Sequence, residues 1–339
     1  MLFPSFHIPL LGDGMTIALV AVTHVLISHG LAIGMLTLIV VLQHIGLRNN
    51  DHEIWALAQR MLKPVVIIVT AVGAVTGAGI WFTVSVLAPN GIGSLLRVFF
   101  WPWFFEWIAF SLEVFILLPY YFLWDRMNAT HPKRHLALGW SYVFVAFVSA
   151  FLISGILGFM LTPDGWVQEH ALWTAFFNPT FWPQLFLRVL GGLTLGGLLS
   201  TGYILYSFRL DLELRRWTAR FFGGWIIVCG SLAAVAAWFY FDAIPSTYAT
   251  HKVFAVMTSH FSQQPQWLLL ANLLAAAFVF GLALVAYFRR LRLAHVLIIP
   301  ALLSAFLFVV QFERIREFIR GPYLIPGYMY ANQISLTLS

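Results

Sequence analysis

The chain has 339 residues, of which 61% are hydrophobic and only 9% are charged. Soluble domains carry about 25% charged residues, so this composition excludes a water-soluble enzyme and indicates an integral membrane protein. The net charge is +6, but the basic residues are divided among several short loops, so no nucleic-acid partner is expected.

Eight apolar runs are each long enough to cross the hydrocarbon core of a bilayer, which takes about 20 residues of helix. They lie near residues 15–46, 64–88, 99–124, 136–161, 183–208, 222–241, 267–288 and 294–312. The sequence therefore predicts an all-α, polytopic bundle of about eight transmembrane helices. No loop is long enough for a second domain, so residues 1–339 are expected to form a single membrane domain.

The loops between these runs differ in charge. Most of the 19 lysines and arginines follow the first, third, fifth and seventh runs. Loops rich in Lys and Arg stay in the cytoplasm, which predicts that both termini are periplasmic in a bacterial inner membrane. The loops 161–182 and 242–266, on the other side, are rich in aromatic, proline and polar residues.

The third run contains the segment FFEWIAFSLE, which carries two carboxylates inside a membrane-spanning helix. Glu106 and Glu113 are seven residues apart, so they lie on one face of the helix, about 10 Å apart along its axis. A carboxylate in hydrocarbon costs several kcal/mol unless it is paired, protonated or faces a wet cavity. We expect this pair to carry protons or to lie beside a cofactor. The alternative is a protonated carboxyl that bonds a neighbouring helix.

Two histidines and one arginine also lie within predicted spans. His24 is about three turns into the first run, and His29 follows five residues later, on another face of a regular helix. A histidine deep in an apolar helix can ligate haem iron through a ring nitrogen, and the alternative is a hydrogen-bonded packing role. Arg188, in the fifth run, could extend to the interface or pair with a haem propionate or with Glu106.

Further candidates lie outside the spans. His251 and His260 are in the last outer loop, where either could be a ligand or an interfacial residue. Arg320 follows the last run, where an arginine can hold a haem propionate by two hydrogen bonds. The glycines at 73 and 77 and at 192 and 196 have the spacing of close helix packing. The one cysteine, Cys229, excludes a disulfide within the chain and a cysteine-ligated iron–sulfur cluster.

Several segments, in order, resemble subunit I of the cytochrome bd quinol oxidases. They are THVLISHGLAIG in the first run, GAVTG in the second, the two-glutamate third run ending in WDR, Gly165-Trp166, Asn178-Pro179 before a glycine-rich fifth run, and Glu317-x-x-Arg320-x-Pro322. The resemblance covers residues 15–210 and 305–323. Within the single membrane domain, residues 211–293 are then expected to form variable helices. Residues 294–339 are expected to form the last helix and an outer C-terminal segment.

The resemblance implies roles for individual residues. The first-helix histidine of that family ligates a haem on the outer side, which makes His24 the expected ligand of haem iron. The third-helix glutamates serve the high-spin haem and its proton supply, roles that would fall to Glu113 and Glu106. Arg320 matches an arginine near the haems. The resemblance also implies haem b, a quinone and a second membrane subunit.

Three departures from the family pattern alter these expectations. Arg188 stands where the family has a histidine ligand of the low-spin haem. The loop associated with quinol binding is cut to about 25 residues, and there are eight spans where the family has nine. One haem site is therefore expected to be lost or rebuilt, with His29, His251 and His260 as candidate ligands.

The sequence thus predicts an oxidoreductase subunit that passes electrons between membrane quinone and a periplasmic c-type cytochrome or another redox partner. The first alternative is a terminal quinol or cytochrome c oxidase that reduces oxygen to water, which Glu113 supports. The second alternative is a haem-free membrane anchor of a redox complex. The intramembrane residues His24, Glu106, Glu113 and Arg188 argue against that anchor.

Overall fold

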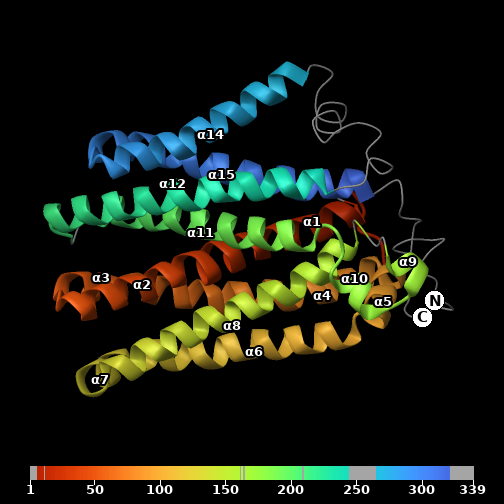
Figure 1. Cartoon of the computed structure of the whole chain (residues 1–339), viewed down its shortest axis with the longest axis horizontal. Coiled ribbons are helices and arrows are strands. Elements are labelled where there is room, and N and C mark those ends of the chain that lie inside the picture. The colour runs from red at the N-terminus through yellow and green to blue at the C-terminus, as the bar shows by residue number, and fades with distance from the viewer. Residues whose placement is uncertain are drawn as a thin grey trace.

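The computed structural model describes residues 6–10, 12–160, 162, 165–207, 210–243 and 265–320, without the side chains of 90, 167, 265–269 and 313–320. Within these residues the chain is helical and has no strand (Figure 1). Eight helices of this described part are long and apolar enough to cross a membrane. The predicted all-α bundle with eight spans is confirmed.

The first two spans each consist of three consecutive helical segments. The first comprises α1 (Asp13–Val25), η1 (Leu26–Met35) and α2 (Leu36–Asn49), and the second α3 (His52–Ile68), η2 (Val69–Gly73) and α4 (Ala74–Leu87). The other spans are α6 (Phe100–Phe122), α8 (Pro132–Phe159), α11 (Phe181–Tyr206), α12 (Leu212–Asp242), α14 (Pro265–Tyr287) and α15 (Leu291–Arg320). Four short helices connect them: α5 (Pro89–Val98), α7 (Trp124–Thr130), α9 (Trp166–Glu169) and α10 (Leu172–Phe176).

The bundle has two distinct ends. At one end, which we call the short-helix end, α5, α9 and α10 gather on the right of Figure 1. The opposite end carries α7 and the junctions α2–α3, α11–α12 and α14–α15. We call it the basic end, because most lysines and arginines of the chain lie in or beside these junctions.

Two spans begin earlier than their hydropathy predicts. The second starts at His52 rather than near 64, and the sixth at Leu212 rather than near 222. Asp51 and Asp211 cap these helices, each accepting hydrogen bonds from two backbone N–H groups of the first turn. The same N–H groups lower the pKa of the Asp211 carboxyl. The capped polar turns are therefore helical, although they are too polar to be detected as membrane-spanning sequence.

The segments η1 and η2 are π-helices, and they pack against each other. A π-helix bonds residue i to residue i+5, is rare, and often occurs at functional sites. Its wider turn places residues i and i+5 on nearly the same face of the helix, whereas a regular α-helix places them on different faces. The sequence does not predict this departure from a regular helix.

The first and fifth spans cross in backbone contact through glycine. A Cβ on Gly196 would lie 2.2 Å from the carbonyl carbon of Gly34, and one on Gly192 would lie 2.8 Å from the carbonyl oxygen of His29. No side chain fits at either position without moving one helix. The packing role predicted for Gly192 and Gly196 is confirmed.

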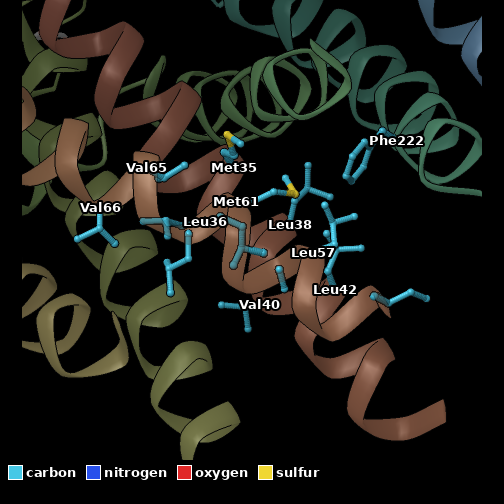
Figure 2. Close-up of a cluster of buried hydrophobic side chains, with 14 of the residues drawn as sticks. Met35, Leu36, Leu38, Val40, Leu42, Leu57, Met61, Val65, Val66 and Phe222 are labelled. Atoms are coloured by element: carbon cyan, nitrogen blue, oxygen red, sulfur yellow. The ribbon is translucent and has the colours of Figure 1, made fainter. Parts of the chain in front are cut away.

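The largest hydrophobic core lies between the first two spans and continues to α8 and α12. Its members include Met35, Leu36, Leu38, Leu42, Leu57, Met61, Val65 and Phe222 (Figure 2). The side chains of α2 and α3 face one another there, and Phe222 reaches toward them from α12. A second core joins α11, α12, α14 and α15. The last two spans are thus packed onto the rest by a core of their own.

A buried polar network joins α2, α6, α7 and α8 in the half of the bundle nearer the basic end. The Tyr120 hydroxyl donates to Gln43 Oε1 at 2.8 Å, and Gln43 Nε2 lies 2.7 Å from His135 Nδ1. Asn128 Nδ2 lies 3.0 Å from the same Nδ1, and His135 Nε2 bonds the Tyr120 carbonyl at 2.8 Å. Since a carbonyl only accepts, Nε2 carries the ring proton and Nδ1 accepts.

Candidate functional site

His24, near the end of α1, is half-buried and has its ring orientation fixed by the second span. Its Nδ1 lies 3.2 Å from the carbonyl oxygen of Gly73 and 3.3 Å from the hydroxyl of Thr76. Because the carbonyl can only accept, Nδ1 carries the proton and the lone pair of the neutral ring is on Nε2. This tautomer, held by a backbone carbonyl, is the usual form of a metal-ligating histidine.

Gly77 gives the His24 ring its room. A Cβ at this position would lie 3.0 Å from Cε1 of the ring. Any larger residue would therefore press on the imidazole. The GAVTG segment of the second span thus supplies both the carbonyl that orients His24 and the space beside its ring.

His29 lies within η1 and packs against Gly192 of α11, whereas the His24 ring packs against Gly73 and Gly77 of the second span. It is close enough to His24 and to Arg188 for their charges to interact. Its Nδ1 lies 2.9 Å from the Ser28 hydroxyl. Its Nε2 is buried and has no hydrogen-bond partner among the described residues. The first span therefore presents its two histidines on different faces.

Glu106 and Glu113 are both half-buried and share the face of α6 that packs against α8. The Ser149 hydroxyl of α8 donates to Glu106 Oε1 at 3.4 Å. The same hydroxyl interacts with Glu113, and the two carboxyls are close enough for their charges to interact. Ser149 therefore links the two carboxyls across the seven-residue spacing. Ser149 could not be found from the sequence, because a lone serine in an apolar helix carries no signal of its own.

Arg188 does not extend to the interface. It is only 6% exposed, and its guanidinium lies 5.9 Å from the ring centroid of Phe312 in α15. One turn earlier on α11, Gln184 is fully buried with its amide nitrogen 3.5 Å from the Ser154 carbonyl. The Oγ of Ser154 and the Oε1 of Gln184 are buried without a partner in the described part of the chain. The inner face of α11 is thus more polar than its composition suggests.

Other predicted site residues fall partly outside the described part. His251 and His260 lie outside the described residues. Arg320 is the last residue of α15, and its side chain is not among those described. Nothing in the geometry relates these three residues to His24.

An apolar groove of about 720 Å³ lies between α11 and α12, toward the short-helix end. Its walls include Trp182, Phe186, Leu232, Val235 and Phe239, and all five side chains are exposed. The groove contains none of the predicted site residues. It therefore lies apart from the histidines and carboxylates described above.

The donors present fit a haem. His24 offers an imidazole nitrogen with its tautomer fixed, and His29 offers a second buried ring nitrogen without a partner. Arg188 supplies a buried cation near them, as a haem propionate requires. The carboxylate pair lies on α6, which packs against α8 and α3.

Comparisons with known proteins agree with this description. The family model of cytochrome bd terminal oxidase subunit I matches residues 15–270. The chain is similar to the solved structure of the bd oxidase from Geobacillus thermodenitrificans, with a TM-score of 0.73 and 19% identity, covering 95% of this chain and 91% of that one. At that identity the likeness concerns the fold. No curated protein matches the sequence.

Proposed function

The chain belongs to the cytochrome bd terminal oxidase subunit I family, and we propose that it is the electron-transferring subunit of a membrane complex. The family is one of haem-binding subunits of respiratory oxidases, and the chain is a multi-pass protein of the bacterial inner membrane. In this proposal it passes electrons between membrane quinone and a periplasmic c-type cytochrome or another redox partner.

The geometry of His24 carries the proposal. A haem held here would supply one-electron chemistry. His24 would hold its iron through Nε2, while the Gly73 carbonyl keeps the ring in orientation. Gly77 keeps the space beside the ring open. Arg188 and Arg320 are proposed to neutralise propionates, and His251 and His260 stay second candidates as ligands.

The sidedness of the bundle supports electron exchange with a periplasmic partner. The basic end is proposed to face the cytoplasm, which places both termini and the short-helix end in the periplasm. His24 is the twelfth residue of its span, which starts at Asp13, so it lies in the half nearer the short-helix end. Electrons could then enter or leave near the periplasmic surface.

A second candidate function is oxygen reduction within this chain. The contact of Ser149 with Glu106, and its interaction with Glu113, favours it, because oxygen reduction consumes protons as well as electrons. In this function Glu113 and Glu106 deliver protons across the α6–α8 interface. A quinol or a cytochrome c would be the electron donor.

A dithionite-reduced optical spectrum of the purified complex, repeated with carbon monoxide, tests the proposal. A haem spectrum that carbon monoxide leaves unchanged supports the lead function, because all iron sites are then six-coordinate. A spectrum shifted by carbon monoxide supports the second candidate. A complex in which no haem belongs to this chain overturns both and leaves the membrane anchor.

A further inference from the structure

His29 contains a buried polar atom that the fold does not use. Its Nε2 is shielded from solvent and has no hydrogen-bond partner among the described residues. Buried polar side-chain atoms are nearly always bonded, and leaving one unpaired destabilises the folded state. A histidine that only packed between helices would be expected to bond through both ring nitrogens.

The other ring nitrogen shows which tautomer is present. The Ser28 hydroxyl donates to the Val25 carbonyl at 3.5 Å, and its oxygen lies 2.9 Å from His29 Nδ1. Because the hydroxyl hydrogen is used by the carbonyl, the hydroxyl oxygen accepts from Nδ1, which therefore carries the ring proton. The unused Nε2 therefore has its lone pair available, as in His24.

The facing helix cannot supply a ligand at this level. Arg188 of α11 lies beside His29, and a guanidinium has no lone pair to give to a metal. Gly192, four residues further along α11, packs against the His29 backbone and offers no side chain. A charged guanidinium does, however, suit a propionate next to an iron-ligating imidazole.

We propose that His29 is the axial ligand of a second haem, so that the first span alone supplies both haem-ligating histidines. Two haems can be held from one span because His24 packs against the second span and His29 against α11, so the two side chains lie on different faces. Arg188 then neutralises the second haem instead of ligating it. The inference rests on the proposed haem-binding function.

The test compares the purified complex of the wild type with His29→Ala and with His44→Ala. His44 is on the same span, is exposed, and meets Trp140 edge-on at 6.1 Å, so it is a matched control. The haem-to-protein ratio and the low-temperature electron paramagnetic resonance spectrum are measured. The expected result is the loss of one haem, or of one low-spin signal, in His29→Ala alone. Added imidazole should restore that low-spin signal.

A His29→Met variant covers the case in which His29→Ala does not fold. Methionine can ligate haem iron, so the low-spin signal should persist with altered g-values. Wild-type spectra and haem content in the folded variants overturn the inference and leave His24 as the ligand. A wild-type complex without haem overturns the proposed function itself, which separates the two failures.

Discussion

Three polar side chains at the interface of α6 and α8 are the groups that we propose for proton transfer. Glu106 and Glu113 face α8, and Ser149 contacts the first and interacts with the second. A hydroxyl both donates and accepts, so it can pass a proton between two carboxyls that do not touch. We propose that Glu113 and Glu106 transfer protons here and that histidine ligates the iron.

This division of roles predicts the effect of removing one carboxyl. In the second candidate function, Glu113→Gln should keep the haem content at the wild-type level and lower turnover with oxygen by about 10²-fold or more, as for other proton-transfer groups. Ser149→Ala should lower turnover by about tenfold, because a water can replace a hydroxyl more readily than a carboxylate. Haem content and oxygen consumption of the purified complex are measured together. Lost haem with unchanged turnover per remaining haem would assign Glu113 a structural role.

Among the elements, the crossing of η1 with α11 matters most for the site. Gly34, Gly192 and Gly196 bring the two backbones into contact beside His29 and Arg188. Since each position lacks space for a Cβ, the spacing of these helices depends on glycine alone. A small displacement of α11 would move Arg188 relative to His29.

The crossing predicts opposite effects at neighbouring glycines. Gly196→Ala should destabilise the folded protein by about 1–3 kcal/mol, because its Cβ would overlap the Gly34 backbone. Gly191→Ala should be neutral or stabilising, because nothing lies within 4 Å of its Cβ and alanine favours a helix. Thermal unfolding in detergent measures both variants. Equal melting temperatures for the two would show that α11 does not depend on this contact.

The polar network between α2, α6, α7 and α8 is a second joint of the bundle. Replacing His135 by Ala removes the acceptor of Gln43 and Asn128, and each buried donor left unpaired costs about 1–3 kcal/mol. We expect a lower melting temperature for His135→Ala. We expect little change for His131→Ala, because His131 is exposed and lies only four residues earlier in the chain. If both variants melt like the wild type, the network contributes nothing to stability.

The spans and most of their boundaries could be predicted from hydropathy, because a bilayer imposes both length and composition. The capped polar turns at His52 and Leu212 could not, because their helicity depends on Asp51 and Asp211 and not on hydrophobicity. The π-helices could not be predicted either, because they leave no composition signal.

Of the candidate site, the sequence predicted the ligand and carboxylate types but not their partners. Glu106 and Glu113 were found because carboxylates are rare in hydrocarbon. Ser149, Gln184 and the His135 network were missed, because uncharged polar residues are common in membrane helices and only the folded chain shows which are buried together.

At the scale of the whole molecule, charge and architecture divide the bundle into two unlike ends. The cytoplasmic placement of the basic end can be tested with introduced cysteines, because the native Cys229 is buried. In intact cells, an impermeant thiol reagent should label Gln168→Cys in α9, at the short-helix end. It should label Ala129→Cys in α7 only after the membrane is opened. The reverse pattern would invert the topology and place His24 nearer the cytoplasm.

The central claim is that the first span of this subunit holds haem iron through His24. The most direct measurement is the reduced-minus-oxidised spectrum and the haem-to-protein ratio of the His24→Ala complex beside the wild type. Loss of a haem signal in the variant, with the partner subunit still bound, is the predicted result. An unchanged spectrum and haem content would contradict the claim, because the iron would then be held elsewhere.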